Sequence, residues 1–321
     1  MKVLALIPGE ELGSSMIFSK RQVNQLIEKG INVKTFFLSS RTSLSVLYSE
    51  LKRFRKEITL FKPDIIHCHY GTVTAMFGTL STTIPKVITY HGSDLNIAKD
   101  VHWTRSYMGH IFSQVAALFA KRIICVSSKL KSRLWWHQSK AEVIPVGVDE
   151  KKFFPTDKQK ARAQLQWDQE KFYILFNANN PIVKRLDIAE NIEKELKKID
   201  ARYNIHYVKG FTPADAMPLL LNASDALLMC SDTEGSPALI KEAMACNLPI
   251  VSNDIGDIAE RLNGVKMCTV VERNGKLMAE KLHEIISMKE RSNGREVILK
   301  EGLTEDDIAD KIISIYNSCI M

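Results

Sequence analysis

The sequence of 321 residues lacks several patterns that would place it in other classes of protein. It has no stretch of 18 consecutive apolar residues, so we expect no transmembrane helix. Its six cysteines form no Cys-x-x-Cys pair, which argues against a zinc site or a disulfide framework and favours reduced, buried thiols. It has no internal repeat and no low-complexity segment. What remains is ordinary globular composition, with 45% hydrophobic and 25% charged residues, and enough length for two α/β domains.

The start of the chain places one lysine before a short apolar run, as a signal peptide does. The run is too short for that role and predicts instead a first buried strand that ends in a glycine-containing loop. Together with the reduced thiols, this interpretation favours a cytoplasmic protein.

The two halves of the chain differ in charge. Residues 1–150 contain 20 Lys and Arg against 11 Asp and Glu, a net charge of +9, whereas residues 151–321 contain 24 against 26, a net charge of −2. The basic half predicts an anionic partner. Its densest clusters, Lys52–Lys56 and Lys129–Trp136, include aromatic residues, which suits peripheral contact with an anionic membrane surface. The alternative is two solvated helix faces. Nucleic acid is not an expected partner, because no recognition motif accompanies the charge.

Short apolar runs alternate with helix-like stretches throughout the sequence. The runs predict strands near residues 3–7, 33–37, 65–69, 87–90, 123–127, 142–144, 173–177, 206–208, 226–230, 250–252 and 267–270. This alternation predicts the α/β class, with doubly wound parallel sheets covered by helices on both faces. Because ligands of such sheets bind beyond the C-terminal strand ends, we expect functional residues in the loops that follow the strands.

A domain boundary is predicted near residues 146–155, where a linker-like segment leads to Pro155. Two α/β domains would then span residues 1–152 and 153–303. The C-terminal segment 304–321 starts with a threonine followed by acidic residues. This resembles a capping box and predicts a last helix over about residues 305–316.

The segment between residues 231 and 256 is the most informative part of the sequence. Glu234 and Glu242 lie eight residues apart, and between them Ser236 at an N-cap position and Pro237 at the first helical position predict a helix start. Apolar runs on both sides indicate strand, loop, helix and strand in that order. Anions bind well at such a helix start, where free N–H groups are expected on Gly235, Ser236, Ala238 and Leu239.

The Glu-x7-Glu spacing, with Gly-Ser-Pro after the first glutamate and Lys-Glu-Ala-Met-Ala-Cys around the second, resembles glycosyltransferase family four. These are retaining nucleotide-sugar enzymes with the GT-B fold, and the phrase is similar to the branch that makes bacterial surface polysaccharides. Residues 144–149 resemble the family's interdomain segment, with Val146 in place of its Asn. The resemblance implies two Rossmann-like domains that face each other across a cleft. The first would bind the acceptor and the second the donor nucleotide, and the last helix would cross back to the first domain.

For the donor, the resemblance implies roles for residues of the second half. It places Glu242 on the ribose diol and Glu234 near the sugar hydroxyls. Lys184 matches the family's diphosphate-binding lysine, whereas Asn179 stands where the family has an arginine. Arg185, at a position where the family usually has glycine, is a candidate to supply that missing charge. The nucleobase would pack on the loop that contains Gly210 and Phe211.

In the first half, two loops carry candidate residues. Gly13 and Ser14 resemble the family's glycine-rich turn, where backbone N–H groups approach phosphate or acceptor. His91 and Asp94 belong to Thr-x-His-Gly-x-Asp, a family motif at a strand end. The resemblance places His91 beside the reacting sugar, as a hydrogen-bonding group rather than a general base. Asp94 would orient neighbouring groups or mark an acceptor site.

We therefore predict a retaining, metal-independent glycosyltransferase with His91, Glu234 and Lys184 as catalytic residues. It would move a sugar from a nucleotide-diphospho-sugar, UDP- or GDP-linked, to a hydroxyl of a glycan or lipid-linked acceptor in cell-surface polysaccharide synthesis, in the cytoplasm or at the inner face of the membrane. No cofactor and no metal are expected, since no Asp-x-Asp triplet occurs. Two alternatives remain open: a non-catalytic sugar-nucleotide or glycan-binding homologue, and a GT-B-fold sugar-nucleotide epimerase.

Overall fold

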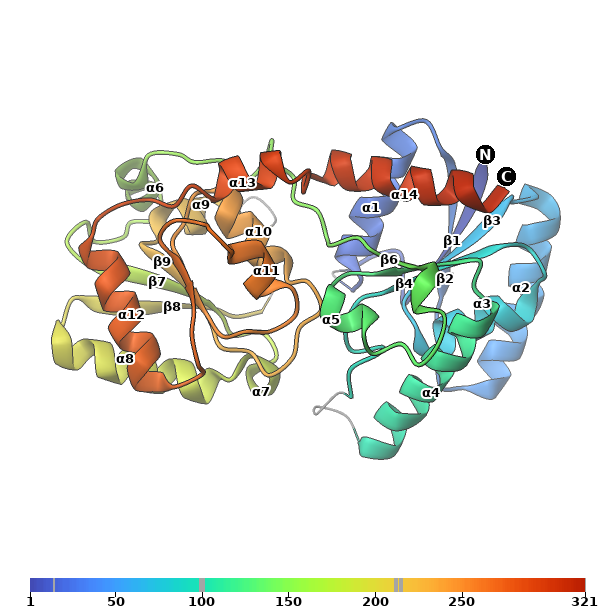
Figure 1. Ribbon diagram of the computed structural model, residues 1–321, viewed down its shortest axis with the longest axis horizontal. Helices are drawn as coiled ribbons and strands as arrows, with labels where there is room; N and C mark the ends of the chain where they lie inside the picture. The colour runs from blue at the N-terminus through green and yellow to red at the C-terminus, as the bar shows by residue number, and fades with distance from the viewer. Residues whose placement is uncertain (14, 98–101, 211–212, 214–215, 321) are drawn as a thin grey trace. The chain divides into compact units, whose positions relative to one another are not determined.

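The computed structural model of the chain describes residues 1–13, 15–97, 102–210, 213 and 216–320, and Figure 1 labels its helices and strands. The chain forms two compact units. The first comprises Met1–Val146 and the segment from Glu305 onward, and the second comprises Gly147–Thr304. The division therefore falls before the expected boundary after residue 152. The reason is that Val148 already packs in the core of the second unit.

The first unit is built on a parallel sheet with the strand order β2-β1-β3-β4-β5-β6. Its strands are β1 (Lys2–Pro8), β2 (Asn32–Leu38), β3 (Ile65–His69), β4 (Lys86–Tyr90), β5 (Arg122–Cys125) and β6 (Ala141–Val143). Each lies where an apolar run predicts it. Because β2 lies on one side of β1 and β3 to β6 follow on the other, the strand order reverses beside β1, and the sheet is doubly wound.

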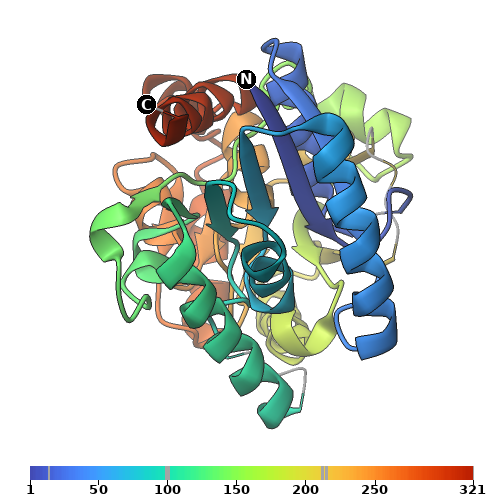
Figure 2. The same cartoon turned by 90° about the vertical axis from the view of Figure 1, so that its right-hand side faces the viewer.

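Helices cover both faces of this sheet. Leu4 and Leu6 of β1 pack with helix residues on one face, whereas Val3 points to the other face, because successive side chains of a strand alternate. Figure 2 shows the helices of the first face in front of the strands: α2 (Leu44–Phe61), α3 (Thr72–Ser81) and α4 (Trp103–Phe119). The second face carries α1 (Ile17–Glu28) and α14 (Glu305–Ile320). The short helix α5 (Ser128–Lys131) and a 3₁₀ turn (Gln138–Lys140) precede β6.

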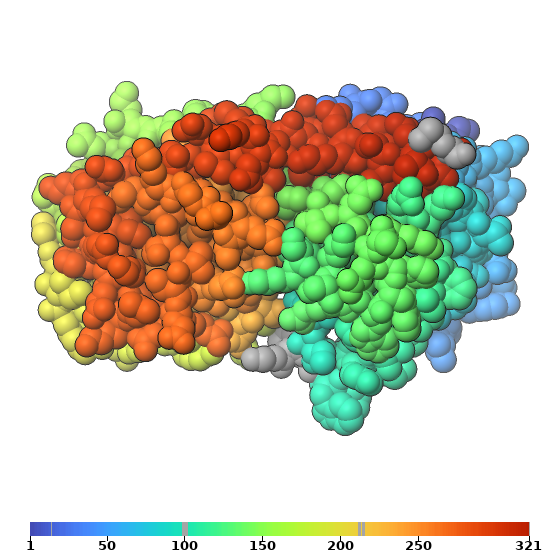
Figure 3. Space-filling view, viewed as in Figure 1, coloured from blue at the N-terminus to red at the C-terminus, as the bar shows by residue number. Residues whose placement is uncertain are grey.

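The last helix, α14, completes the core of the first unit although it is the end of the chain. Its residues Ile308, Ile312 and Ile315 are buried with residues of the central strands. The hydroxyl of Tyr316 lies 2.5 Å from Nδ1 of His67 in β3. The helix continues past the expected end at residue 316, because Cys319 is buried as well. Its outer face is on the surface, as the space-filling view shows (Figure 3).

The second unit is built on a parallel sheet with the strand order β11-β10-β9-β7-β8. Its strands are β7 (Phe172–Asn177), β8 (Tyr203–Val208), β9 (Ala226–Met229), β10 (Ile250–Ser252) and β11 (Cys268–Val270). Two separate apolar clusters, one on each face, join these strands to the helices around them. Those helices are α6 (Lys158–Gln164), α7 (Pro181–Lys184), α8 (Leu186–Ile199), α9 (Ala216–Ala223), α10 (Ala238–Ala245), α11 (Ile258–Leu262), α12 (Gly275–Ser287) and α13 (Gly294–Lys300).

The predicted α/β class is thus confirmed, with parallel sheets and helices on both faces in each unit. Among the described helices, none combines the length and the apolar composition that a membrane span requires.

Candidate functional site

The loops after β7 and β9 bring together two residues that the sequence predicts as catalytic. Lys184 is the last residue of α7, and its Nζ lies 2.5 Å from Oε1 of Glu234 in the loop after β9. Only 18% and 14% of these side chains are exposed, so the pair lies largely out of water. The N–H of Asp232 also donates to the carbonyl of Val183 at 2.8 Å, which ties the two loops together. A cation and a carboxylate therefore meet at the carboxyl ends of the strands, where ligands of parallel sheets bind.

Arg185, the second predicted cation, is already paired in this structure. Its guanidinium donates two hydrogen bonds to the carboxylate of Asp187, at 2.9 and 2.7 Å, and a third to Asp232 at 3.3 Å. The hydrogen bonds to Asp187 raise the pKa of the Arg185 guanidinium. In this arrangement the charge of Arg185 is compensated by two carboxylates, so Lys184 and Arg185 are not equivalent as phosphate-binding groups.

Arg273 is a cation at this edge that sequence reasoning missed. It follows β11, donates to the carboxylate of Asp232, and lies 3.2 Å from the carbonyl of Ser231. No local motif marks Arg273, because its position depends on β9 and β11 ending at the same edge of the sheet. Asp232 consequently links two arginines from distant parts of the chain.

The helix start after Glu234 differs from the prediction in one respect. Helix α10 begins at Ala238 with Pro237 as the N-cap residue, and no side chain caps it. The Ser236 hydroxyl donates instead to Asp257 at 2.7 Å and accepts from Lys241 at 2.7 Å. The hydroxyl donates to Asp257 because the carboxylate of Asp257 is buried, and a buried carboxylate must accept hydrogen bonds from the protein. The expectation of a side-chain cap was wrong.

Two backbone donors at the same helix start have no acceptor. Within the part of the chain that the structure describes, no hydrogen bond is formed by the N–H groups of Ala238 and Leu239. They carry the partial positive charge of the helix N-terminus. Glu242 lies one turn after Ala238 on the same side of α10 and is 9% exposed.

Close packing of two loops explains the glycine at position 256. A Cβ atom on Gly256 would lie 2.7 Å from the carbonyl oxygen of Gly235, and Gly256 has a positive φ of 56°. Only glycine combines this conformation with that distance. The loops after β9 and β10 are therefore held against each other beside α10.

Asn179 and Gly210, two further donor-site candidates, bind each other across the ends of β7 and β8. The N–H of Gly210 donates to Oδ1 of Asn179 at 2.7 Å, and Nδ2 of Asn179 donates to the carbonyl of Gly210 at 3.3 Å. Asn179 thus stabilises the loop in which the nucleobase is expected. Phe211, the other candidate there, lies outside the described residues.

In the first unit, His91 lies at the end of β4 in a row of three histidine rings. The ring of His69 stacks 6.4 Å from that of His91 and 3.9 Å from that of His67, and the ring of Phe18 lies 4.5 Å from His91. Burial lowers the pKa of His69 to about 3 and holds the pKa of His67 and His91 well below the usual value, with smaller contributions from the neighbouring rings. Both ring nitrogens of His91 lack a hydrogen-bond partner in the described structure. His91 is therefore a neutral imidazole with free donor and acceptor capacity.

Asp94 is fully buried rather than exposed to a ligand. Its carboxylate accepts hydrogen bonds from the N–H groups of Gly71, His91 and Gly92, at 2.8 to 3.1 Å. Burial raises its pKa, although these three N–H groups act in the opposite direction. Of the two expectations for Asp94, the structure favours that of an orienting group, because its oxygens hold the loops after β3 and β4 together.

Gly13 lies in the exposed loop between β1 and α1 with a positive φ of 102°, and its carbonyl accepts from Nζ of Lys20 at 3.1 Å. Its neighbour Ser14 falls outside the residues that the structure describes. This loop leads directly into α1, which carries Phe18 against His91.

A pocket of about 410 Å³ lies at the carboxyl edge of the first unit's sheet, and we call it the Tyr70 pocket. The segments after β2, β3 and β4 supply one wall each, and the first half of α4 supplies another. None of the described lining residues is among the predicted site residues, although Asp94, which is one of those, contacts one of these segments. The lining residues are Arg41, Thr42, Tyr70, Thr72, Val73, Ser93, Arg105, Ser106, Met108, Gly109 and Phe112.

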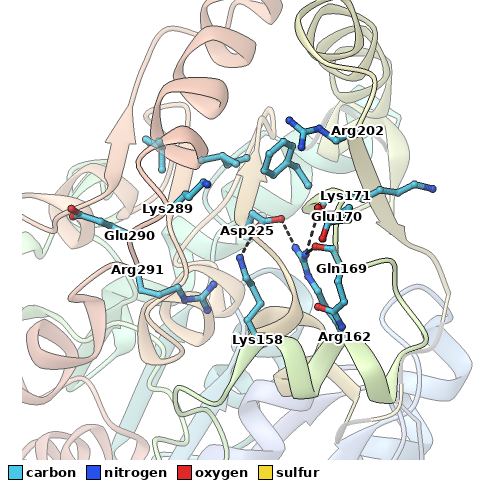
Figure 4. Close-up of a pocket in the computed structure, with 13 residues that line it drawn as sticks. Lys158, Arg162, Gln169, Glu170, Lys171, Arg202, Asp225, Lys289, Glu290 and Arg291 are labelled. Carbon is cyan, nitrogen blue, oxygen red and sulfur yellow. Dashed lines mark hydrogen bonds and ion pairs between the residues drawn. The ribbon is translucent and has the colours of Figure 1, made fainter.

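A second basic pocket, of about 320 Å³, lies at the amino ends of the strands in the second unit, and we call it the Asp225 pocket (Figure 4). Lys158 and Arg162 both point to the carboxylate of Asp225, at 2.9 and 2.6 Å. Arg162 is 2% exposed and also donates to the carbonyls of Ala223, Gln169 and Lys171. This charge network joins α6 to the start of β7 and β9.

Among the described residues, no group of three or more His, Cys, Asp or Glu side chains is arranged to hold a metal ion. The rings of His67, His69 and His91 follow one another in a row, with His69 and His91 stacked and His67 tilted by 34° to His69.

Comparisons with known proteins agree with these features. Residues 13–152 match the family described as Glycosyltransferase Family 4, and residues 165–288 match the family described as Glycosyl transferases group 1, so the two matches together span most of the chain.

Two curated relatives share about a quarter of the aligned residues. An uncharacterized glycosyltransferase of Methanocaldococcus jannaschii is 25% identical over 246 residues, which cover 71% of this chain and 66% of that protein. The putative teichuronic acid biosynthesis glycosyltransferase TuaC of Bacillus subtilis is 24% identical over 239 residues, covering 68% of this chain and 60% of TuaC. The matched region thus spans less than two thirds of each relative.

Among solved structures, HepE of Anabaena in complex with UDP-glucose is similar with a TM-score of 0.74 and 16% identity, over 99% of this chain and 100% of HepE. At this identity the likeness concerns the fold alone. It confirms the predicted pair of Rossmann-like α/β domains of the GT-B type.

Proposed function

Because the chain belongs to the family 4 glycosyltransferases, we propose that it transfers a sugar, with retention of configuration, from a nucleotide-diphospho-sugar to a hydroxyl of a glycan or lipid-linked acceptor. The observation that carries this proposal is the Lys184–Glu234 pair beside the N-terminus of α10. Transfer from such a donor releases a nucleoside diphosphate. The site must therefore stabilise negative charge on a leaving group and hold the hydroxyls of a sugar.

The leaving diphosphate is assigned to Lys184 and to the N–H groups of Ala238 and Leu239. A lysine and a helix N-terminus that are fixed before the reaction stabilise developing negative charge without reorganisation. Lys184 contacts one carboxylate, that of Glu234, and this contact can be exchanged when a donor sugar binds Glu234. Arg185 contacts two carboxylates. We therefore assign the main electrostatic role to Lys184 and no metal ion to the site.

The sugar and the ribose are assigned to the two glutamates. Glu234 would accept hydrogen bonds from donor-sugar hydroxyls once Lys184 turns to the diphosphate. Glu242, near the start of the same helix, would accept two hydrogen bonds from the ribose diol. The loop of Asn179 and Gly210 would support the base.

His91 is assigned to a sugar hydroxyl. Its low pKa keeps the imidazole neutral at pH 7, so one ring nitrogen can donate and the other can accept. Retention would follow from attack of the acceptor hydroxyl on the face from which the diphosphate leaves, with the departing phosphate taking the proton.

The choice of donor and setting rests on similarity. HepE binds UDP-glucose, and TuaC is named for teichuronic acid synthesis. A UDP-sugar, with a GDP-sugar as the alternative, and cell-surface polysaccharide synthesis at the cytoplasmic face of a membrane are accordingly our proposal for this chain.

A calorimetric titration of UDP- and GDP-sugars in EDTA, followed by an assay of nucleoside diphosphate release, tests the proposal. Glu234→Gln should lower turnover by about 10²- to 10³-fold, the usual loss when one group that stabilises the transition state is removed. Glu280→Gln, an exposed glutamate on α12, is the matched control. Binding without turnover in the native chain would favour the non-catalytic homologue, and unchanged turnover in Glu234→Gln would contradict the site.

A further inference from the structure

The Tyr70 pocket holds positive charge that no acidic residue of its described lining neutralises. Arg41 and Arg105 line it, and none of the lining residues that the structure describes is Asp or Glu. Arg41 is exposed and lies over the ring of Tyr70, 5.4 Å from the ring centroid. The guanidinium of Arg105 forms no hydrogen bond or ion pair with any described residue. Two arginines around one cavity whose described lining has no carboxylate are arranged to receive an anion.

Hydroxyl groups complete the polar lining. The hydroxyls of Tyr70 and Ser93 lie 2.6 Å apart, and Thr72 also lines the cavity. Burial raises the pKa of Tyr70, so its hydroxyl stays protonated and can donate. Such groups bind sugar hydroxyls or the remaining oxygens of an anion.

The wall of the pocket is a strained turn after β3. Tyr70 has a φ of 121° and Thr72 a φ of 55°, both rare for residues with a side chain, and each such conformation costs roughly 1–3 kcal/mol. The turn is held by buried groups: Asp94 accepts from the N–H of Gly71 at 3.0 Å, and the Ser113 hydroxyl accepts from the N–H of Thr72 at 2.7 Å. Strain that a structure maintains in this way clusters at ligand sites.

The size of the cavity fits a sugar-sized molecule, since pockets for small ligands start at about 300 Å³. Its place also fits, because it lies at the carboxyl ends of β2, β3 and β4, strands of one parallel sheet. The same Asp94 that holds the turn also fixes the backbone of His91, so the pocket and the predicted catalytic histidine share one scaffold.

We propose that the Tyr70 pocket binds an acceptor that carries a phosphate or a carboxylate, with Arg41 and Arg105 on this anion and the hydroxyls of Tyr70 and Ser93 on its sugar-like part. The identification of the bound molecule as an acceptor rests on the function proposed above, whereas the binding of an anion in this pocket does not. A planar guanidinium binds either anion through two parallel hydrogen bonds. The pocket therefore distinguishes charged from neutral molecules more strongly than it distinguishes phosphate from carboxylate.

Calorimetric titrations of the full chain with glycerol phosphate and with glucuronate, against glycerol and glucose as uncharged counterparts, test the proposal. We expect at least one anion to bind and both neutral molecules to fail. The preferred anion identifies the group as phosphate or carboxylate. Arg41→Gln and Arg105→Gln should each weaken the binding about tenfold, which corresponds to about 1.4 kcal/mol.

Two further variants locate the bound anion. Lys52→Gln removes a lysine from α2, in the same unit but outside the pocket lining, and should leave the affinity unchanged. Lys184→Gln should lose affinity for UDP but retain the binding of the anion. Loss of anion binding in Lys184→Gln would place the anion at the donor phosphates and overturn the proposal. Equal binding of charged and neutral molecules, no binding of either anion at millimolar concentration, or unchanged binding in both arginine variants would also overturn it.

The outcome is independent of the proposed transferase activity. If no nucleotide-sugar binds but the anion still depends on Arg41 and Arg105, the function fails while the anion site stands. If nucleotide-sugar is turned over but the arginine variants behave as the native chain does, the anion site fails while the function stands.

Discussion

The Tyr70 pocket and the Asp225 pocket are both lined by cations, but two arginines of the Asp225 pocket are bound by the protein itself. In the Asp225 pocket, Arg162 donates to three carbonyls and to Asp225, and Arg291 donates to the carbonyls of Ser224 and Cys246. In the Tyr70 pocket, Arg41 and Arg105 line a cavity in which the described residues include no carboxylate. Whether the cations already have hydrogen-bond acceptors in the protein, rather than the number of basic residues, therefore distinguishes a structural pocket from a binding pocket.

The edges of the sheets explain the difference. The Asp225 pocket lies at the amino ends of β7 and β9, where the chain enters the sheet and its carbonyls need donors. The Tyr70 pocket lies at the carboxyl ends of β2, β3 and β4, where loops diverge and leave room for ligands.

The largest effect is expected from Arg162→Ala in the Asp225 pocket. This variant leaves Asp225 short of one of its charge partners and removes the donor of one buried and two partly buried carbonyls, so the free energy of unfolding should fall by about 3–5 kcal/mol. Urea denaturation measures it. Lys158→Ala removes the other cation on Asp225, but this side chain is 44% exposed, and the loss should stay below about 1 kcal/mol. Similar losses in both variants would show that the buried Arg162 contributes no more to stability than the partly exposed Lys158.

The next largest effect is a loss of stability at acid pH, caused by His67, His69 and His91. In the folded protein the pKa of His67, His69 and His91 is lowered, whereas in the unfolded chain it is about 6.5, so the unfolded state binds more protons. Stability is therefore fully present above pH 6.5 and decreases as the pH falls below it.

By pH 5 the loss should reach about 2 kcal/mol for each histidine that remains neutral. Urea denaturation at pH 7.5 and pH 5 measures this, and His69→Gln should reduce the difference. An identical pH dependence in His69→Gln and the native chain would contradict the assignment.

Gly71→Ala should break the strained turn of the Tyr70 pocket. The added Cβ would lie 2.7 Å from the ring of Tyr90 and 3.0 Å from Cβ of Asp94, an overpacking that costs about 1–3 kcal/mol. A lowered midpoint in thermal unfolding is expected. Gly264→Ala, at a glycine with no atom within 4 Å of the added Cβ but a positive φ of 74°, separates the cost of overpacking from that of conformation.

The smallest change in stability is expected for Arg105→Gln and Arg41→Gln. Neither side chain is built into the fold as Arg162 is, so the free energy of unfolding should change by no more than about 0.5 kcal/mol. The same urea experiment measures it. A loss as large as that of Arg162→Ala would mean that the Tyr70 pocket is structural too, and the comparison would then fail.

The sequence predicted the elements of both units well. Runs such as Ile65–His69 and Ala226–Met229 are apolar because parallel strands are buried on both faces, and a glycine or a turn residue follows each of them. The sequence also predicted that Lys184 and Glu234 belong to one site, through the resemblance, and the structure places them 2.5 Å apart. Their roles in binding the donor remain predictions.

Other details depended on competition between groups that are distant in sequence. Ser236 has the side chain of a good N-cap, yet its hydroxyl is taken by Asp257, 21 residues later. Arg185 looked available for a diphosphate, yet Asp187 and Asp232 hold it. Arg273 carried no signal at all, because it meets Asp232 only where β9 and β11, on either side of β10, end at the same edge of the sheet.

By itself, the sequence determined the α/β class, the existence of two sheets and the family, because these follow from local apolar patterns and from one contiguous motif. Only the tertiary structure decided which charges are compensated and which are free. That decision depends on strand order and on the burial of carbonyls and carboxylates, so it separates Arg162 from Arg105 although the two residues are chemically identical.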